Sequence, residues 1–260
     1  MTTVRPKVTA IIQARMASTR LPGKSLMDIA GKPLFEHVAD RVRVSRSIRS
    51  VVLATTTEAS DDPLAELGLR LGLGVYRGAS KDVLDRYYRA AKSFDAQVVV
   101  RVTADDPFKD PEVIDYVIEQ FFAGALTDYA SNTIERTYPE GLDIEMFSFR
   151  ALERAWKEAT LNSDREHVTP YMWRNPQLFR IVSVKSERDY SQLRWTIDYE
   201  QDLVFARAVY ARLYHQPIFV MEDILQLLER EPGLQAINSG IRRNDGWLRS
   251  LEQDRASRSE

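Results

Sequence analysis

Apolar runs alternate with amphipathic stretches along the first half of this chain. Residues 8–14 form an apolar run of the kind found in a strand that is buried on both faces. Further runs predict strands at 50–56, 75–78 and 97–103. Residues at 3.6-residue spacing predict helices from Pro33, at 61–73, at 80–94 and at 111–123. Repeated β–α units of this length predict an α/β chain with a mainly parallel central sheet and helices on both faces.

The second half of the chain is less regular and predicts a mixture of short strands and helices. Strands are expected at residues 128–132, 142–149, 179–185 and 193–198. Helices are expected at residues 150–159, 199–214 and 221–231. The polar segment after Trp247 is expected to fray. Because we find no repeat and no low-complexity linker, we expect a single Rossmann-like domain of three-layer α/β/α architecture over residues 1–250, followed by a polar tail at 251–260.

The composition narrows the range of partners. The 260 residues carry a formal net charge of −2, which does not favour a nucleic-acid-binding protein. Without cysteine the chain has no disulfide framework, thiol nucleophile or cysteine zinc site, and its three histidines are too scattered to suggest a metal cluster. No apolar stretch approaches the length of a membrane span, and residues 1–7 do not resemble a signal peptide. We therefore expect a cytoplasmic protein that binds neither nucleic acid nor membrane.

A cationic loop follows the first predicted strand and is the strongest indication of chemistry. It holds Arg15, Arg20 and Lys24 within ten residues, together with proline, glycine and small hydroxyl residues. At the carboxyl edge of a parallel sheet, where ligands bind, these cations and backbone N–H groups suit a polyphosphate. A P-loop is one alternative, because G-K-S at 23–25 matches the end of that motif, although Ser18 replaces its first glycine. A solvated loop without a ligand is the other alternative.

Several motifs resemble those of the sugar-activating cytidylyltransferases, the group that makes CMP-linked 3-deoxy-octulosonate and CMP-linked sialic-type acids. They are Q-A-R-M-A-S-T-R-L-P-G-K-S-L at 13–26, G-A-S-K-D-V-L at 78–84, T-A-D-D-P at 103–107, G-L-D-I-E at 141–145 and S-D-R-E-H at 163–167. The likeness extends to the branch described as spore coat polysaccharide biosynthesis protein F and covers most of the chain. It implies a nucleotidyltransferase fold with a nucleotide-binding half over 1–125 and an acceptor-binding half over 126–220.

The resemblance implies that the first loop wraps a triphosphate, with Arg15 and Lys24 as catalytic cations and Arg20 assisting. Ala17 stands where the family often has glycine, and alanine also permits a close backbone approach. The nucleotide is expected to contact the first strand, its end and the loop after the third strand. These contacts are Ala10, Ile12, Gln13, Ala14, Arg77, Gly78 and Ser80. Ser80 has an alternative role as the N-cap of the helix predicted after it.

Two carboxylates are candidates for a metal site. Asp105 ends one predicted strand, and Asp198 ends another directly before a helix. The resemblance implies that both bind Mg²⁺ and that Asp105 is catalytic; Mg²⁺ keeps several waters, so two carboxylates and phosphate oxygens suffice. Asp106 is expected to point elsewhere, and Asp202 to complement the helix N-terminus. The alternatives are a turn and helix cap at 105–107 and a helix-capping role for Asp198.

Two further segments are candidates for binding an acceptor. Gly141 allows a close approach, while Asp143 and Glu145 share one face of an extended strand and could bind acceptor hydroxyls or amines or help to hold metal. Arg165 could pair with an acceptor carboxylate or phosphonate, and His167 follows two residues later. The alternatives are a polar strand face lining a cleft, a structural salt bridge at Arg165 and a hydrogen-bonded structural histidine.

Together these observations predict a Mg²⁺-dependent cytidylyltransferase. It would join CMP from CTP to a sugar acid, or to a related phosphate or phosphonate acceptor, and release pyrophosphate. The product would serve surface polysaccharide or glycoconjugate biosynthesis. The alternatives are a glycosyltransferase that uses a nucleotide sugar and a non-catalytic nucleotide-binding regulator. The resemblance also implies a homodimer, with residues 163–174 as a candidate interface element.

Overall fold

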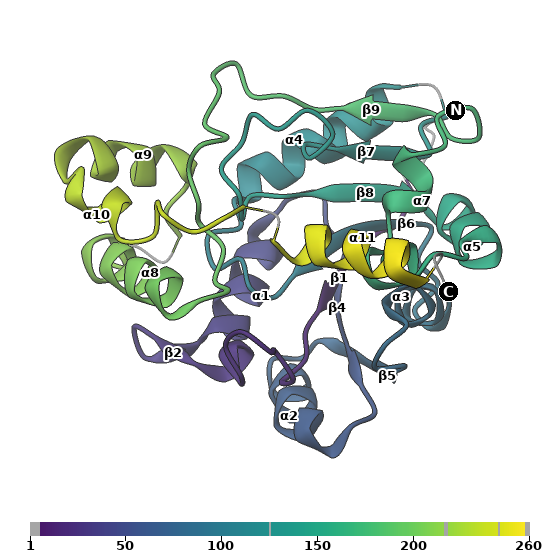
Figure 1. Ribbon diagram of the computed structural model, residues 1–260, viewed down its shortest axis with the longest axis horizontal. Coiled ribbons are helices and arrows are strands. Elements are labelled where there is room, and N and C mark those ends of the chain that lie inside the picture. Colours follow the sequence, from purple (N-terminus) through teal and green to yellow (C-terminus); the bar gives the residue numbers. More distant parts are fainter. Residues whose placement is uncertain (1–5, 125, 216–217, 244, 258–260) are drawn as a thin grey trace.

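A seven-stranded sheet runs through the centre of the computed structural model, which describes residues 6–124, 126–215, 218–243 and 245–257 (Figure 1). The strands are β1 (Val8–Gln13), β2 (Asp28–Ile29), β3 (Lys32–Pro33), β4 (Ser50–Thr56), β5 (Gly74–Gly78), β6 (Val98–Thr103), β7 (Tyr129–Ser131), β8 (Glu145–Ser148) and β9 (Ile181–Ser183). The order in the sheet is β5-β4-β1-β6-β8-β7-β9, and β2 and β3 form a separate hairpin. Among these strands, β8 runs antiparallel to β6 and β7, and the other neighbours in the large sheet are parallel.

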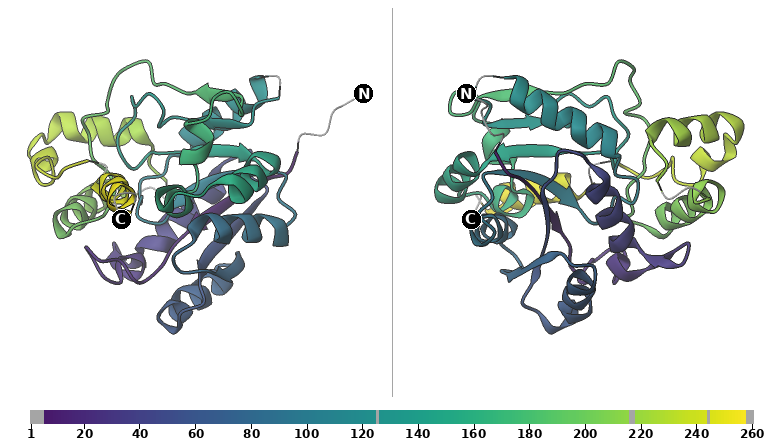
Figure 2. Two further views of the ribbon diagram at one scale, coloured as in Figure 1. Left: turned by 45° about the vertical axis from the view of Figure 1, so that its right-hand side comes forward. Right: turned by 180° about the vertical axis from the view of Figure 1, so that it is seen from behind.

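Helices cover both faces of this sheet. They are the 3-10 helices η1 (Lys24–Leu26) and η2 (Ala59–Asp61) and the α-helices α1 (Leu34–Val44), α2 (Asp62–Arg70), α3 (Val83–Ser93), α4 (Pro111–Ala123), α5 (Phe149–Glu158), α6 (Asn162–His167), α7 (Pro170–Trp173), α8 (Glu200–Leu213), α9 (Met221–Arg230), α10 (Gly233–Ala236) and α11 (Asp245–Ser257). The turned views place α1 and α4 on the face opposite to α3 and α5 (Figure 2). Within the described residues, no helix combines the length and apolar character needed to cross a membrane.

The alternation of side chains along β1 explains the two apolar cores that enclose the sheet. Val8, Ala10 and Ile12 pack into one cluster with α1 and α4, whereas Ile11 points into the other with α3 and α5. A strand buried on both faces needs apolar residues at consecutive positions, which is the pattern of residues 8–14. The predicted three-layer α/β/α fold with a mainly parallel sheet is therefore confirmed.

Most elements lie where the hydrophobic pattern predicts them, and residues 50–56 and 111–123 agree with β4 and α4 to the residue. The strand predicted at 193–198 is wrong, because this segment is irregular and makes an isolated bridge between Glu140 and Arg194. Its apolar residues are buried by tertiary packing rather than by a place in the sheet.

The helix predicted at 80–94 begins three residues later, at Val83. Asp82, rather than Ser80, is its N-cap and accepts a hydrogen bond from the Asp85 N–H at 2.8 Å. The capping role considered for Ser80 is therefore wrong.

The C-terminal segment departs most from the predicted architecture. Residues expected to fray form α11, which crosses in front of the ends of β1 and β6 in Figure 1. The helix packs on α6, where the Ser163 N–H donates a hydrogen bond to Asp254 at 3.2 Å. A polar helix of this kind is stabilised by tertiary contacts that its own periodicity does not reveal. The boundary predicted at residue 250 falls inside α11, while residues 258–260 of the predicted tail, like residues 1–5, lie outside the described residues.

Gly141 lets two irregular segments approach each other closely. Its φ of +109° lies in the region that favours glycine, and a Cβ there would lie 2.7 Å from the backbone carbonyl carbon of Trp195. The Trp195 N–H donates a hydrogen bond to the Glu140 carbonyl at 2.7 Å, and the Glu140 N–H donates one to the Leu193 carbonyl at 3.0 Å. This backbone contact directs the chain toward Asp198.

We predict that Gly141→Ala lowers the free energy of unfolding by about 2 kcal/mol or more, because the new Cβ strains the backbone and displaces Trp195. Urea denaturation followed by circular dichroism measures the change. Gly233→Ala is the matched control, since no heavy atom of the described residues lies within 4 Å of its Cβ position. That substitution should change the free energy by less than about 1 kcal/mol. Equal effects at the two positions would contradict this role of Gly141.

Candidate active site at the carboxyl edge of the sheet

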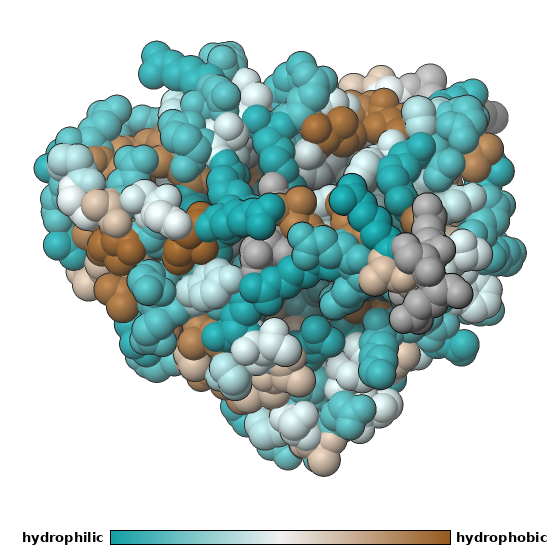
Figure 3. All heavy atoms as spheres, in the orientation of Figure 1, coloured by the Kyte–Doolittle hydropathy of each residue, from teal (hydrophilic) through white to brown (hydrophobic). Residues whose placement is uncertain are grey.

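Two adjoining cavities open where β1 and β6 end. The smaller one, which we call the basic cavity, has a volume of about 450 Å³ and is lined by Arg15, Arg20, Lys24, Arg86, Arg101 and Arg249 among other residues. The other, which we call the larger cavity, has a volume of about 680 Å³. Both are lined by Arg20, Arg101, Thr103, Asp105, His167, Asp198 and Gly246. Hydrophilic side chains cover the middle of the face crossed by α11 (Figure 3). Two ligands bound in these cavities would therefore meet beside Asp105 and Asp198.

The Lys24 ammonium lies between the two carboxylates predicted to bind metal. Its Nζ lies 2.9 Å from Asp105 Oδ2 and 2.8 Å from Asp198 Oδ1, and it donates to the Ile197 carbonyl at 2.7 Å. Burial lowers the pKa of Lys24, but the two carboxylates outweigh burial and raise this pKa above its usual value. A charged ammonium therefore joins three loops that lie far apart in the sequence.

Asp198 interacts with a second cation. Arg20 approaches Asp198 Oδ1 at 2.5 Å, and its guanidinium lies 5.6 Å from the centre of the Tyr199 ring. Burial raises the pKa of Asp198, but Lys24 and Arg20 overcome burial and hold this pKa at about 2. The predicted capping alternative for Asp198 is wrong, because Asp202 accepts the hydrogen bonds of the Asp198 and Tyr199 N–H groups at 2.9 and 3.0 Å.

Asp105 and Asp106 have different surroundings, as expected for successive residues of an extended segment. Asp105 contacts Lys24, whereas the buried Asp106 accepts hydrogen bonds from Thr103 Oγ1 at 2.5 Å and from Lys109 Nζ at 2.8 Å. Burial raises the pKa of Asp106 to about 6. The helix α4 is capped by Asp110, so the helix-capping alternative for the Asp105 turn is wrong.

The basic cavity brings together the cationic loop and the end of the first strand. The predicted nucleotide contacts on its wall are Gln13, Ala14, Arg15, Arg20 and Lys24. Arg86 from α3 and Arg101 from β6 add two cations to this wall. The cavity therefore concentrates positive charge beside Asp105 and Asp198.

The described walls of the two cavities do not include Ala10, Ile12, Arg77, Gly78 and Ser80, which were also predicted to contact the nucleotide. Ala10 and Ile12 precede the end of β1, and their side chains are buried in the core. Arg77 donates a hydrogen bond to the Thr56 carbonyl at 2.8 Å. The sheet thus directs Ala10 and Ile12 into the core and Arg77 to a neighbouring strand.

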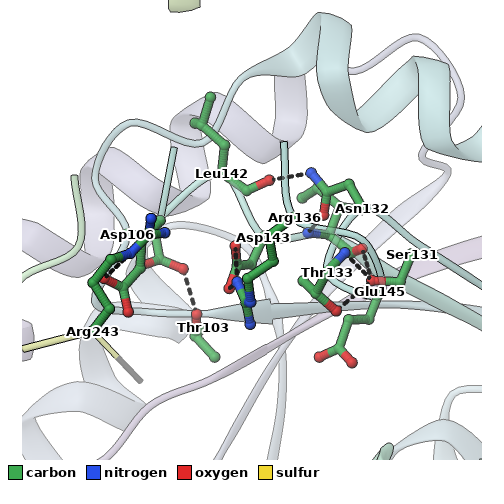
Figure 4. A network of polar contacts seen from close by, with 12 residues as sticks. Thr103, Asp106, Ser131, Asn132, Thr133, Arg136, Leu142, Asp143, Glu145 and Arg243 are labelled. Carbon is green, nitrogen blue, oxygen red and sulfur yellow. Dashed lines mark hydrogen bonds and ion pairs between the residues drawn. The ribbon is translucent and has the colours of Figure 1, made fainter. Parts of the chain in front are cut away.

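The larger cavity contains Gly141, Asp143 and Glu145, as the acceptor hypothesis requires, but both carboxylates have partners; Figure 4 shows the Arg136 that faces Asp143. Asp143 accepts hydrogen bonds from Arg136 at 3.1 and 3.2 Å. Glu145 forms an ion pair with Arg101 and accepts further hydrogen bonds from the hydroxyls of Tyr129 and Thr169. Each carboxylate therefore holds an arginine on the cavity wall.

The S-D-R-E-H motif places one of its two predicted acceptor contacts in the site. Arg165 forms an ion pair with Asp82 at 2.6 Å and donates to the Trp156 carbonyl at 2.7 Å, away from the described walls of both cavities. Arg165 therefore forms the structural salt bridge that was the alternative to acceptor binding. His167 lines both cavities, and its Nε2 lies 2.9 Å from Ser250 Oγ. Burial lowers the pKa of His167 to about 4, so the imidazole is neutral at pH 7.

Several wall residues were not predicted from the sequence, among them Arg86, Arg101, Arg136, Trp247 and Arg249. Arg101 had a recognisable signal, since it is a charged residue within the apolar run V-V-V-R-V-T at 98–103. A charge buried in a sheet needs a partner, which Glu145 supplies here. The other wall residues lie on elements whose approach to the site depends on tertiary packing.

Asp105 and Asp198 are the candidates for holding a metal ion. Among the residues that the structure describes, no group of three or more His, Cys, Asp or Glu side chains is arranged to hold a metal. These two carboxylates nevertheless converge on one cation, the Lys24 ammonium, at 2.9 and 2.8 Å. Such a pair fits Mg²⁺ when phosphate oxygens and water complete its six ligands.

Comparison with known proteins relates this chain to cytidylyltransferases. The cytidylyltransferase family matches residues 9–231. The spore coat polysaccharide biosynthesis protein SpsF of Bacillus subtilis is 32% identical over 230 residues, which cover 85% of this chain and 94% of that protein. A 3-deoxy-manno-octulosonate cytidylyltransferase of Geobacter sulfurreducens is 41% identical over 114 residues, which cover 43% of this chain and 44% of that protein.

A solved structure extends the similarity to the whole fold. A cytidylyltransferase from Leptospira borgpetersenii matches with a TM-score of 0.86 and 31% sequence identity, covering 92% of this chain and 100% of that chain. The resemblance predicted from the sequence motifs is therefore confirmed.

We predict that His167 makes the free energy of unfolding depend on pH below neutrality. Its folded-state pKa of about 4 lies below the usual 6.5, so its stabilising contribution is complete above pH 6.5 and is lost as the pH falls toward 4. Between pH 7 and pH 4.5 the natural protein should lose about 2 kcal/mol more than His167→Gln, whose amide does not titrate. Urea denaturation at a series of pH values measures this difference.

His215→Gln is the control, because His215 is exposed and distant from the cavities. Its pH profile should follow that of the natural protein. Parallel profiles for the natural protein and His167→Gln would show that the burial of His167 has no such effect.

Proposed function

This chain belongs to the cytidylyltransferase family, and we propose that it joins CMP from CTP to a sugar acid or a related acidic acceptor. The observation that carries this proposal is the cluster of Lys24, Asp105 and Asp198 at the junction of the two cavities. A transfer between two substrates requires that both reach the same charged groups. The basic cavity suits the nucleotide, and the larger cavity suits the acceptor.

The cations of the basic cavity support the binding of a triphosphate. Arg15, Arg20 and Lys24 come from one loop, and Arg86 and Arg101 extend the positive wall. Positive charge fixed before the reaction lowers the free energy of a transition state in which negative charge accumulates on the departing pyrophosphate. We assign this role to Arg15 and Lys24, with Arg20 assisting.

We propose that Asp105 and Asp198 hold Mg²⁺ together with oxygens of the bound triphosphate. When bound, the ion would neutralise charge on the α-phosphate and orient it. Lys24 would then leave the carboxylates and contact the phosphates, which its flexible four-carbon stem permits. Asp105 and Asp198 would thus have a cationic partner both before and after the nucleotide binds, first Lys24 and then Mg²⁺.

In the proposed reaction an acceptor oxygen attacks the α-phosphorus in line with the bond to the β-phosphate. The new oxygen–phosphorus bond forms while the bond from the α-phosphorus to the pyrophosphate oxygen breaks. The acceptor hydroxyl loses its proton to solvent. The chain contributes alignment of the two substrates and compensation of charge, which are the main requirements of phosphoryl-group transfer.

Two arginines of the larger cavity support an acidic acceptor. Arg101 and Arg136 lie on its wall, each positioned by a carboxylate. The matched relatives are named for spore coat polysaccharide biosynthesis and for 3-deoxy-manno-octulosonate, a sugar acid. We infer from them a role in surface polysaccharide or glycoconjugate biosynthesis. No feature of the site favours the glycosyltransferase or the regulator that the sequence left open.

Pyrophosphate release from the purified protein tests this proposal. CTP, UTP, ATP and GTP are each combined with Mg²⁺ and a panel of octulosonates, nonulosonates, hexuronates and phosphonates. We expect release that requires both CTP and one class of acidic acceptor. Asp105→Asn should reduce the rate about 100-fold or more, because it removes a charge that the reaction needs. The exposed Glu119→Gln on α4 is the control and should retain the full rate.

Other results would contradict the proposal. Binding of CTP without turnover across the whole panel would support a regulator. A normal Mg²⁺-dependent rate in Asp105→Asn would refute the role assigned to that carboxylate.

We predict two effects of Lys24→Met. Turnover should fall about 100-fold or more, because the triphosphate loses a cation. In the absence of nucleotide, MgCl₂ should raise the Tm more than it does for the natural protein, because Asp105 and Asp198 no longer have the ammonium between them. Differential scanning fluorimetry across a MgCl₂ series measures the second effect.

Lys32→Met is the matched control, since Lys32 forms an ion pair with Asp40 at 2.7 Å away from both cavities. Its MgCl₂ response should equal that of the natural protein. An equal response in Lys24→Met would show that the ammonium does not compete with the metal for these carboxylates.

A further inference from the structure

We propose that α11 forms an acceptor wall, in which Trp247 and Trp173 stack on the apolar face of a sugar ring in the larger cavity. This inference rests on the proposed function and adds the acceptor's shape to it. The matched family region ends at residue 231, whereas α11 begins at Asp245. Trp247 therefore lies outside the matched region, whereas Trp173, at the end of α7, lies within it.

Contacts between α11 and α6 hold this wall in place. Ser250 Oγ donates a hydrogen bond to Glu166 at 2.7 Å and lies 2.9 Å from His167 Nε2. One turn later, Asp254 accepts the hydrogen bond of the Ser163 N–H at 3.2 Å. Two turns of α11 are thus bound to the two ends of α6, and the helix has a defined position across the strand ends.

The first turn of α11 reaches the reacting region itself. Gly246 lines both cavities, and a Cβ at this position would lie 3.6 Å from the Arg20 guanidinium. The next residue, Trp247, lines the larger cavity, while Arg249 and Ser250 line the basic cavity. One helix therefore contributes to the walls of both cavities.

The aromatic part of the wall is a pair of indole rings. The ring centres of Trp173 and Trp247 are 5.7 Å apart in an edge-to-face arrangement, and Trp247 is also edge-to-face with His167 at 5.1 Å. Both indoles are half-buried, so part of each ring is accessible from the cavity. Aliphatic residues continue this surface at Ile134, Pro170, Pro176 and Ile181.

The same cavity presents charged groups as well, including the arginines Arg101 and Arg136. A cavity with an aromatic surface and a few fixed polar groups selects ligands that have one apolar face and one polar, acidic side. A pyranose acid has this character, because its C–H groups can lie on an indole while its carboxylate and hydroxyls meet polar side chains. The cavity volume of about 680 Å³ accommodates such a molecule.

Steady-state kinetics with the acceptor found in the pyrophosphate assay tests this inference. Trp247→Ala should raise the KM for the acceptor roughly tenfold and leave the KM for CTP unchanged. Trp247→Phe should keep the KM for the acceptor close to that of the natural protein, because phenylalanine keeps an aromatic face. Glu252→Gln is the control on the same helix, since the exposed Glu252 is not among the described wall residues.

An unchanged acceptor KM in Trp247→Ala would overturn the inference. An equal rise in the KM for CTP would also overturn it, because the indole would then serve the nucleotide or the folding of the whole edge. Circular dichroism of each variant separates loss of fold from loss of acceptor binding.

A binding measurement keeps this inference separate from the proposed function. The fluorescence of the protein's tryptophans is titrated with 3-deoxy-manno-octulosonate, a nonulosonate and a hexuronate. We expect a saturable change that is lost in the double variant Trp173→Phe/Trp247→Phe and retained in Trp156→Phe, whose indole stacks on Tyr88 at 4.1 Å, away from the cavities. That result would support the wall even if no turnover occurred. No saturable change with any of these acids, or one that survives in the double variant, would reject it.

Discussion

The position of the Lys24 ammonium between Asp105 and Asp198 is the constraint on which this site depends. A buried ammonium is stable only when carboxylates compensate it, and two carboxylates directed at one point need a cation between them. The three side chains lie on the loop after β1, the turn after β6 and the segment before α8. Their mutual compensation therefore holds three loops at one edge of the sheet.

The shared wall of the two cavities makes this arrangement suitable for transferring a group from one molecule to another. A group in transfer contacts both the molecule that it leaves and the molecule that it joins. Side chains that line both cavities, such as Arg20, Arg101 and Asp198, can stay in contact with it throughout the reaction. Because Glu145 holds Arg101 before any ligand arrives, this guanidinium needs little reorganisation during the transfer.

In the proposed function, α11 would give a site on a shared fold its own specificity. The parallel strands and the cationic loop belong to the region matched by the family, and they supply the charges that a nucleotide requires. The C-terminal helix lies outside that region and lines the larger cavity, which we propose binds the acceptor. Segments added at the edge of a sheet can vary without disturbing the core, so they are suited to selecting among acceptors.

The sequence by itself determined the layered fold and the cationic loop after β1, because burial on two faces requires consecutive apolar residues and helices require a 3.6-residue period. It also grouped Lys24, Asp105 and Asp198, although the strand expected before Asp198 does not form. Only the tertiary structure decided that Arg165 turns away from the cavities, that Arg136 enters one of them and that α11 forms its wall. These outcomes depend on ion pairs and packing between residues far apart in the chain, and such pairings leave no local periodicity from which they could be predicted.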